Sequence, residues 1–339
     1  MRAAFIDGKD QIEVRDAPAP APGPGEVRLR VDYVGICGSD LHYFFEGANG
    51  EYVVREPLVP GHELSGRVDE DPSGRLAPGT PVTVHPARFG TSEPGIEDAP
   101  HLWPNGSYLG SASTWPHTQG AMSELVVVRE DMVRVLPEGL PVRRAVLAEP
   151  LGVALHAASR AGDLTGKTVL VSGAGPIGLL AVAAARARGA AHVTASDLLE
   201  APLRRAEALG ADAVVRIGQD ELPQGAFDVV LECSGAPVAI SAAVAAVRRR
   251  GVVVQVGMVP AEPRPVNLAP LISKEAQLVG TFRFREEIDE AIALLAERPE
   301  IEEAITHVLP LEDAESAFGI ARDAQTSSKV VVSLPGAEN

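Results

Sequence analysis

The sequence predicts an α/β protein with two domains, a β-rich domain and a doubly wound domain built on a parallel sheet. In roughly the first 140 residues, short strand patterns are separated by Pro- and Gly-rich turns. After Pro141, apolar segments of strand length alternate with helical segments, which is the pattern of βαβ units. The chain has 339 residues, enough to form two hydrophobic cores.

The β-rich part has its clearest strand pattern at residues 27–33. Val27, Leu29, Val31 and Tyr33 alternate there with Arg28, Arg30 and Asp32, as in a strand with one buried face. Turn-forming clusters lie at residues 17–25, 71–74 and 78–81. Short strands between such turns are typical of a barrel-like domain.

The second part predicts helices and strands in turn. They are helix 151–161, strand 168–171, helix 177–188, strand 192–196, helix 201–209, strand 228–233, helix 238–248, strand 252–256 and strand 276–280. Helices at 286–297 and 311–322 and a strand at 329–334 follow, and these elements could return to the first domain. We therefore expect a first domain in two segments, 1–148 and 285–339, around a second domain at 149–284.

Composition narrows the possible partners and locations. The formal net charge of −16 argues against a nucleic-acid partner, because phosphates need a basic surface. Two cysteines cannot form a disulfide framework, and the N-terminus meets charged residues too early for a secretory signal. The uncharged stretch 168–185 is long enough to suggest a membrane span, but its glycines, Ser172 and Pro176 fit a dinucleotide-binding turn better. We expect a cytoplasmic protein without membrane contact.

The glycine-rich turn predicts a dinucleotide site. Gly173, Gly175 and Gly178 follow an apolar strand and open an alanine-rich helix, with Pro176 and Ile177 between them. These glycines allow a tight turn, a close approach of the cofactor pyrophosphate and close helix–strand packing. The N-terminus of the helix attracts the negative charge of the pyrophosphate. The alternative is a glycine turn that binds nothing.

Asp197 lies at the end of the next predicted strand. Its carboxylate would accept hydrogen bonds from the adenosine ribose and repel a 2′-phosphate, so NAD is favoured over NADP. The alternative is an ordinary surface residue at a strand end.

A second set of residues suggests a metal site. Cys37, His62 and Glu63 offer sulfur, nitrogen and oxygen ligands, which suit catalytic zinc with one open position. Taken singly, Cys37 is better explained as a buried thiol and His62 as a hydrogen-bonded core residue. Glu149 precedes Pro150 at a predicted helix start between the two domains, where it could bind zinc or a zinc-bound water.

Five segments together resemble a known family. They are GICGSDLHYF (35–44), VPGHELSGRV (59–68), AEPLGVALHA (148–157), SGAGPIG (172–178) and LVGTFRF (278–284). The chain is similar to the zinc-dependent medium-chain dehydrogenase superfamily, above all to its polyol branch of sorbitol and L-idonate 5-dehydrogenases. This resemblance implies a GroES-like catalytic domain and a Rossmann domain that binds NAD.

The resemblance also implies roles for individual residues. Cys37, His62 and Glu63 match the catalytic zinc ligands, Glu149 binds zinc directly or through water, and Asp40 orients a ligand. Ser39 and His42 match a proton relay. The cofactor-binding positions are Gly173, Gly175, Pro176, Ile177, Gly178, Asp197, Ser234, Val256, Thr281 and Arg283. Tyr43, Arg283 and Phe284 match positions that line the polyol pocket.

The sequence departs from the family in two places. The stretch 88–109, where relatives usually hold a structural zinc with four cysteines, contains none. We therefore expect one zinc per subunit and a lobe held together by packing, with Trp103 restricting the loop. Pro202 replaces a basic residue near the adenosine, although Arg204 and Arg205 lie close by. Relatives also suggest a homodimer or homotetramer.

The expected reaction is hydride transfer from a secondary alcohol of a sugar acid or polyol to NAD. Arg283 could bind the carboxylate of a sugar acid, or it could form a structural salt bridge. The segments 280–284 and 116–120 resemble those of the idonate enzymes, and this resemblance favours L-idonate, oxidised to 5-keto-D-gluconate, over sorbitol. Xylitol, a butanediol and threonine are further alternatives, and a catalytically inactive cofactor-binding protein is the alternative from another class. Cys233 and the remaining histidines are expected to be structural.

Overall fold

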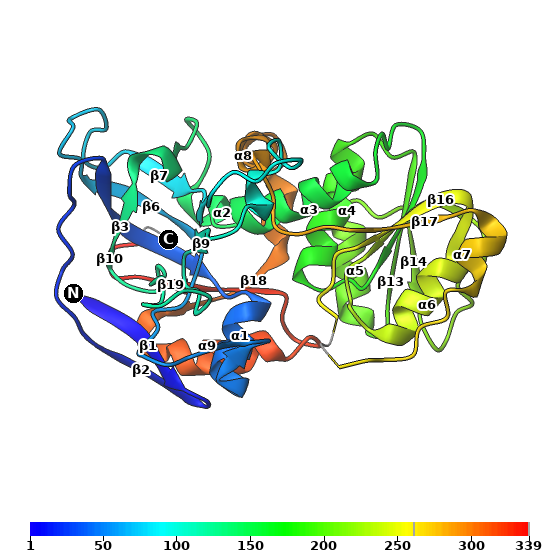
Figure 1. Ribbon diagram of the computed structural model, residues 1–339, viewed down its shortest axis with the longest axis horizontal. Coiled ribbons are helices and arrows are strands. Elements are labelled where there is room, and N and C mark those ends of the chain that lie inside the picture. Colours follow the sequence, from blue (N-terminus) through cyan, green and yellow to red (C-terminus); the bar gives the residue numbers. More distant parts are fainter. Residues whose placement is uncertain (260–261, 338–339) are drawn as a thin grey trace.

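The computed structural model describes residues 1–259 and 262–337. Two domains lie side by side along the long axis of the molecule, with helix α3 (Ala148–Arg160) between their sheets (Figure 1). The predicted fold class is confirmed, since a β-rich domain accompanies a parallel-sheet domain of the Rossmann type.

The first domain is built on short strands. They are β1 (Arg2–Gly8), β2 (Gln11–Asp16), β3 (Glu26–Gly35), β4 (Ala48–Asn49), β5 (Tyr52–Val53), β6 (Glu63–Glu70), β7 (Pro81–Val84), β8 (Ala87–Arg88), β9 (Ser107–Tyr108), β10 (Leu125–Arg129) and β11 (Val133–Val135). Helices α1 (Gly38–Glu46) and α2 (Val142–Ala145) complete this part. The main sheet has the order β11-β7-β6-β3-β19-β18, and β10 also pairs with β3.

Strand β3 follows the predicted alternation only in its first half. Val27, Leu29 and Val31 are buried, and Arg30 is exposed. Asp32, expected on the polar face, is fully buried instead, where its carboxylate contacts Arg67 Nε at 3.1 Å. At this end β3 is paired with β6 and β19 along both edges and successive residues are buried on both faces, so a buried charge there needs a partner.

The second domain contains a six-stranded parallel sheet. Its strands are β12 (Thr168–Ser172), β13 (His192–Asp197), β14 (Ala213–Arg216), β15 (Phe227–Glu232), β16 (Val247–Gln255) and β17 (Gln277–Gly280). Helices α4 (Pro176–Ala187), α5 (Glu200–Ala208), α6 (Pro237–Ala246) and α7 (Ala269–Lys274) connect or cover them. The order β14-β13-β12-β15-β16-β17 reverses direction between β12 and β15, and ligands of doubly wound sheets bind at such a switch point.

Two predicted helix boundaries were wrong. The helix expected at 238–248 ends at Ala246, because Val247 already pairs with Phe227 and begins β16. The β-branched Val247 is fully buried in this strand. Helix α3 begins at Ala148, three residues before the predicted start, so Pro150 lies within its first turn. Strand β14 and helix α7 were not predicted.

The C-terminal elements return to the first domain. Helix α8 (Glu287–Glu297), strand β18 (Ile305–Pro310), helix α9 (Ala314–Arg322) and strand β19 (Lys329–Ser333) follow β17. Strand β19 pairs antiparallel with β3, with Val331 opposite Gly35, and parallel with β18. Short 3₁₀ helices occur at η1 (Pro100–Leu102), η2 (Glu130–Met132), η3 (Pro299–Ala304) and η4 (Leu311–Asp313). The exact domain boundaries stay a prediction.

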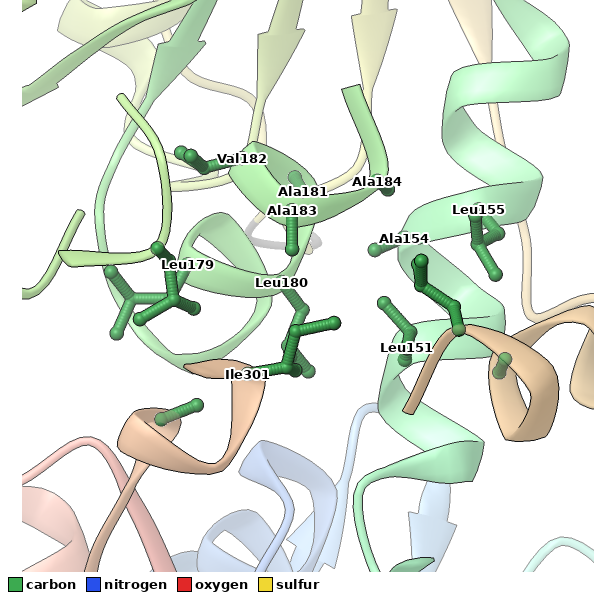
Figure 2. Close-up of a cluster of buried hydrophobic side chains, with 14 of the residues drawn as sticks. Leu151, Ala154, Leu155, Leu179, Leu180, Ala181, Val182, Ala183, Ala184 and Ile301 are labelled. Atoms are coloured by element: carbon green, nitrogen blue, oxygen red, sulfur yellow. The ribbon is translucent and has the colours of Figure 1, made fainter. Parts of the chain in front are cut away.

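Helices α3 and α4 pack through small and aliphatic residues. Figure 2 shows Leu151, Ala154 and Leu155 of α3 facing Leu180 and the alanines of α4, with Ile301 of η3 below them. The alanines let the two helix backbones approach closely, and each buried leucine contributes about 1.5–3 kcal/mol. This packing fixes α3, which carries Glu149 in its first turn, against α4, the helix that the glycine-rich turn opens.

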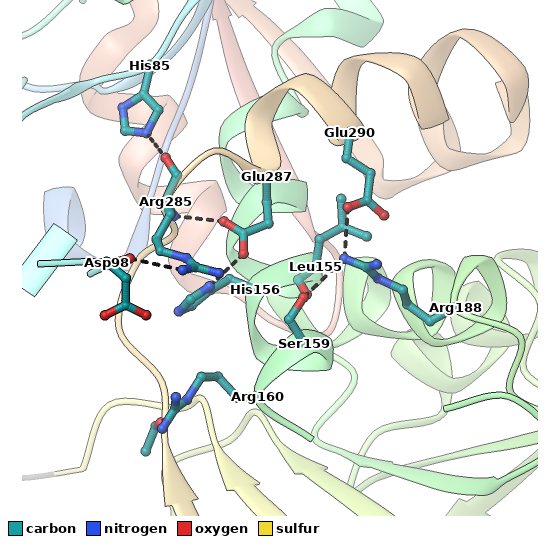
Figure 3. A network of polar contacts seen from close by, with 11 residues as sticks. His85, Asp98, Leu155, His156, Ser159, Arg160, Arg188, Arg285, Glu287 and Glu290 are labelled. Carbon is teal, nitrogen blue, oxygen red and sulfur yellow. Dashed lines mark hydrogen bonds and ion pairs between the residues drawn. The ribbon is translucent and has the colours of Figure 1, made fainter. Parts of the chain in front are cut away.

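The cysteine-free stretch 88–109 is held by polar contacts within itself and with Arg285, just before helix α8. Within it, Trp103 Nε1 donates to Ile96 O at 2.9 Å. Arg285 Nη1 donates to Asp98 O at 3.0 Å, and the backbone oxygen of Arg285 lies 2.6 Å from His85 Nε2 (Figure 3). The expectation that Trp103 restricts this loop agrees with these contacts.

His101 should make the docking of this loop sensitive to acid. Its ring lies 4.8 Å from that of His156, which bonds Glu287 at 2.7 Å, and Arg285 and Arg160 lie near. Burial and His156 lower the pKa of His101 from 6.5 to about 4. The folded state therefore binds fewer protons, and its free energy of unfolding should fall by about 1 kcal/mol between pH 7 and 5.

Urea unfolding at these two pH values measures the loss. A His101→Gln variant keeps a polar side chain of similar size but cannot take up the proton, so its stability should change less over this range. Equal losses in both proteins would contradict the assignment to His101.

Candidate metal centre and cofactor site

Cys37, His62 and Glu63 converge in the first domain. One ligand atom from each lies within 4.8 Å of the others, and no other such group of His, Cys, Asp or Glu occurs among residues 1–259 and 262–337. Cys37 caps α1 directly after β3, and Glu63 begins the neighbouring strand β6. Because Gly35 pairs with Glu63 across these strands, residues far apart in the sequence meet at one strand end.

Asp40 holds the two ligand loops together. Its Oδ2 accepts the Cys37 N–H at 2.9 Å, and its Oδ1 accepts the Gly61 N–H at 3.2 Å. The side chain is fully buried. Asp40 was expected to orient a ligand, and here it fixes the backbone on either side of the ligand set.

Two glycines leave the space that this arrangement needs. A Cβ on Gly35 would lie 2.1 Å from Glu63 Oε2. Gly61 has φ +94°, and a Cβ there would lie 2.5 Å from Val34 Cγ1. Both positions therefore require glycine, one for side-chain space and one for a left-handed backbone as well.

The charge of the cluster fits a divalent cation. Burial lowers the pKa of His62, but the Cys37 sulfur, Asp40 and Glu149 outweigh it and raise the pKa to about 10. Glu63 Oε2 is buried and has no hydrogen-bond partner among the described residues. A cation that displaced the His62 proton would relieve both the excess negative charge and the unpaired oxygen. Sulfur, imidazole and carboxylate ligands suit zinc.

One cation of the chain itself already balances part of this charge. Lys329 Nζ lies 2.6 Å from Glu63 Oε1 and donates to Ile36 O at 3.0 Å. Lys329 is 2 % exposed and sits at the start of β19, which places it beside β3. Burial lowers the pKa of Lys329, but Glu63, Cys37 and Glu149 raise it more, so the ammonium form is kept. Sequence reasoning missed this residue.

Glu149 lies beside the cluster without being part of it. It is buried in the first turn of α3, and its Oε1 accepts a hydrogen bond from Tyr108 Oη at 2.5 Å. Burial raises the pKa of Glu149, and Glu63 adds to this shift. Whether Glu149 binds a metal directly stays a prediction.

Tyr108 was also missed, and it touches three components of the site. Besides its bond to Glu149, its ring meets the His62 ring edge-on at 5.3 Å, and Arg283 Cζ lies 3.9 Å from its centroid. The only signal in the sequence is its position at the end of the cysteine-free stretch 88–109.

The expected proton relay lies on α1. Ser39 follows Cys37 in the first turn of the helix and is half-buried. His42 is exposed one turn later, with Nδ1 at 3.1 Å from Glu46 Oε1. The helix thus leads from the metal cluster to the surface.

Two of the expected substrate residues, Tyr43 and Phe284, are buried. Tyr43 is 2 % exposed, and its hydroxyl accepts the Ala112 N–H at 3.1 Å. Phe284 is 1 % exposed and packs against Gly152 and the His85 ring. Substrate contact by these two residues stays a prediction.

The glycine-rich turn has the geometry of a pyrophosphate cradle. Gly173 has φ +92°, and a Cβ on Gly178 would lie 1.8 Å from Gly173 O. A Cβ on Gly175, by contrast, would meet no atom within 4 Å, so the space over this residue is open. Pro176 and Ile177 begin α4, whose N-terminus is therefore free to receive a phosphate.

The other expected cofactor residues lie at the carboxyl ends of the parallel strands. They are Asp197 at the end of β13, Ser234 after β15, Val256 after β16, and Thr281 and Arg283 after β17. Asp197 Oδ2 accepts the Ala174 N–H at 2.8 Å, which ties the acid to the glycine turn. Thr281 Oγ1 is buried without a hydrogen-bond partner among the described residues.

Comparison with known proteins identifies the family. The model of the alcohol dehydrogenase GroES-like domain matches residues 23–138, and that of zinc-binding dehydrogenases matches residues 176–297. The L-idonate 5-dehydrogenase (NAD(P)(+)) of Escherichia coli (strain K12) is 37 % identical over 290 residues, which cover 84 % of this chain and 82 % of the relative. The chain belongs to the zinc-dependent medium-chain dehydrogenases.

Other medium-chain dehydrogenases agree with this assignment. The sorbitol dehydrogenase of Bacillus subtilis (strain 168) is 34 % identical, covering 87 % of this chain and 86 % of the relative. The crystal structure of L-idonate 5-dehydrogenase from Escherichia coli superposes with a TM-score of 0.90 at 32 % identity, covering 98 % and 97 % of the two chains. The crystal structure of 2R,3R-butanediol dehydrogenase from Bacillus subtilis superposes with a TM-score of 0.86 at 27 % identity. The match covers 98 % of this chain and 99 % of that chain.

The polyol branch of these medium-chain dehydrogenases uses zinc and NAD(P), and this chain presents a matching cluster of Cys37, His62 and Glu63. The substrate of this dehydrogenase is a small molecule. No helix in the described part of the chain is both long enough and apolar enough to cross a bilayer.

Proposed function

We propose that this dehydrogenase oxidises L-idonate to 5-keto-D-gluconate, with NAD as the hydride acceptor. The observation that favours a sugar acid over a neutral polyol is that the guanidinium of Arg283 has no ion-pair partner in the described chain. The Arg283 side chain is half-buried over the ring of Tyr108, which meets the His62 ring, and it forms no hydrogen bond or ion pair with any described residue. A guanidinium held in this way can bind a substrate carboxylate with two parallel hydrogen bonds.

The similarity to L-idonate 5-dehydrogenase supports the same substrate, both in sequence and in fold. The intact cluster of Cys37, His62 and Glu63 argues against a catalytically inactive cofactor-binding protein. Sorbitol and other polyols lack the carboxylate and would leave Arg283 without a partner.

Zinc, NAD and the residues of the chain have different roles in the proposed reaction. Zinc supplies a Lewis acid that lowers the pKa of the substrate hydroxyl, and NAD accepts the hydride. Cys37, His62 and Glu63 would hold the metal, while Arg283 orients the substrate by its carboxylate. Ser39 would take up the hydroxyl proton while donating its own proton onward, and His42, on the exposed side of α1, would release a proton to solvent.

NAD is proposed over NADP because of the charges around the adenosine ribose. The Asp197 carboxylate would repel a 2′-phosphate. Glu200 pairs with Arg204 at 2.5 Å and with Arg216 at 3.5 Å, which leaves these arginines less able to bind that phosphate. The name of the Escherichia coli relative includes both cofactors, so a panel should contain both.

We also propose a homo-oligomer, either a dimer or a tetramer, in the cytoplasm. Strand β17 lies at the edge of its sheet, and apolar side chains around it are exposed, among them Ile272, Leu278 and Met258. Exposed apolar surface at a sheet edge is typical of a subunit contact. A reducing compartment would keep the Cys37 thiol available as a metal ligand.

A substrate panel tests the proposed function. L-idonate should give a kcat/KM at least about tenfold above those of sorbitol, xylitol, 2,3-butanediol and threonine, since a charge-assisted pair with Arg283 is worth roughly 1.5–3 kcal/mol. NAD should be preferred to NADP. Replacing Arg283 by Leu should raise KM for L-idonate by roughly tenfold to a hundredfold and leave that for sorbitol within about threefold. Sorbitol oxidised better than L-idonate would reject the assignment.

A further inference from the structure

We propose that Tyr108 is a positioning residue that also determines substrate specificity, because it links Glu149 beside the metal cluster to Arg283 at the substrate. This inference rests on the proposed function. Tyr108 is 5 % exposed and lies in the short strand β9. Tyr108 is not among the site residues that the family resemblance implies.

The hydroxyl of Tyr108 restrains Glu149. Its Oη donates to Glu149 Oε1 at 2.5 Å, and no other side chain in the described ranges donates a hydrogen bond to this carboxylate. Glu149 lies close to the ligand cluster, and free rotation would let it turn toward a bound cation. The hydrogen bond therefore keeps the carboxylate beside the metal and leaves the open position to the substrate oxygen.

The ring of Tyr108 fixes Arg283. The guanidinium carbon lies 3.9 Å from the centroid of this ring, and the Phe282 ring approaches it at 4.8 Å. The backbone of Arg283 has φ +50°, a left-handed conformation that a non-glycine residue adopts only where its surroundings hold it. Stacking on an aromatic ring leaves the N–H donors at the edge of the guanidinium free for an anion.

The same ring also touches the metal cluster. It meets the His62 ring edge-on at 5.3 Å, so one rigid side chain contacts a metal ligand, Glu149 and the arginine. A substrate carboxylate on Arg283 would then lie at a set distance from the metal. That distance selects which hydroxyl along a sugar acid reaches the reacting position, and a neutral polyol gains nothing from it.

Two substitutions separate the roles of the hydroxyl and the ring. Tyr108→Phe keeps the ring and frees Glu149, which can then compete with substrate for the metal. We expect kcat/KM to fall by roughly tenfold to a hundredfold for L-idonate and sorbitol alike. Tyr108→Leu also removes the platform under Arg283, so KM for L-idonate should rise by a further factor of about ten relative to that for sorbitol.

Two measurements on the metal itself accompany the kinetics. Protein reconstituted with Co²⁺ should show a changed visible absorption spectrum in Tyr108→Phe, and a chelator should remove the metal more slowly, because Glu149 adds a ligand. Tyr52→Phe, which alters an exposed tyrosine outside the site, is the matched control and should behave as the unmodified protein. Circular dichroism verifies that each variant is folded.

The outcomes for this inference and for the proposed function can be told apart. If the unmodified protein oxidised no sugar acid or polyol, the proposed function would fail, while the Co²⁺ spectrum would still test the contact between Tyr108 and Glu149. If the protein is active and Tyr108→Phe matches it in kcat/KM, spectrum and metal release, the inference is overturned. The conservative Phe variant decides this even where the Leu variant fails to fold.

Discussion

A Lys329→Met variant should lose about 3–5 kcal/mol of its free energy of unfolding in the metal-free state. Lys329 Nζ lies 2.6 Å from Glu63 Oε1, and both side chains are almost completely buried. Removing the ammonium leaves the Glu63 carboxylate without its cation, beside Cys37 and Glu149. A buried charge that loses its partner cannot regain hydration, which makes this loss far larger than that of an exposed ion pair.

The effect should depend on zinc. A bound divalent cation compensates the Glu63 charge, so the zinc-loaded variant should be destabilised less than the metal-free variant. Urea unfolding with and without a chelator measures both states, and Lys9→Met serves as a control at an exposed lysine. Adding Glu63→Gln to Lys329→Met should restore part of the stability of the metal-free protein, because no unpaired charge then remains. A loss below about 1 kcal/mol would show that the pair is not the buried interaction seen here.

A His62→Ala variant should lose its metal and nearly all of its activity. The purified protein should hold one zinc per chain, and the variant should hold little, because only Cys37 and Glu63 would remain of the clustered ligands. Loss of the Lewis acid removes several kcal/mol of transition-state stabilisation, so kcat/KM should fall by at least about a thousandfold.

Two further variants separate metal loss from other causes. Ser39→Ala should keep its zinc but lose turnover, since it removes only the proposed proton acceptor. His192→Ala, at an exposed histidine in β13, should keep both zinc and turnover. Metal analysis and NAD reduction on the same samples give the comparison. Full activity in metal-free His62→Ala would contradict a metal-dependent reaction.

Much of the fold could be predicted because its signals are local. The parallel sheet followed from the alternation of apolar strands and helices, and each strand predicted after Pro141 is present. Strand β14 was missed because its four residues, Ala213–Arg216, are too few for a clear period. The end of helix α6 was misplaced because Val247 belongs to β16 through its pairing with Phe227, a contact that the sequence does not reveal.

The residues of the candidate site also fall into two groups, those that the sequence indicated and those that it did not. The glycine turn and the motifs around Cys37, His62 and Glu63 are short stretches whose residue types reveal their chemistry, so the sequence indicated them. Tyr108 and Lys329 carry no such motif. Each lies far along the chain from the residues it contacts, and only strand pairing and helix packing bring them together.

The sequence by itself determined the family, the ligand types and the dinucleotide turn, because these depend on the identity and spacing of neighbouring residues. Only the tertiary structure decided which charges are paired, which carboxylate is restrained and which cation is left for a substrate. Those properties depend on distance and burial. Arg283 lies half-buried on the Tyr108 ring and forms no ion pair with the described chain, whereas Lys329 is enclosed with Glu63. Such differences arise when segments distant in sequence meet in a low-dielectric interior.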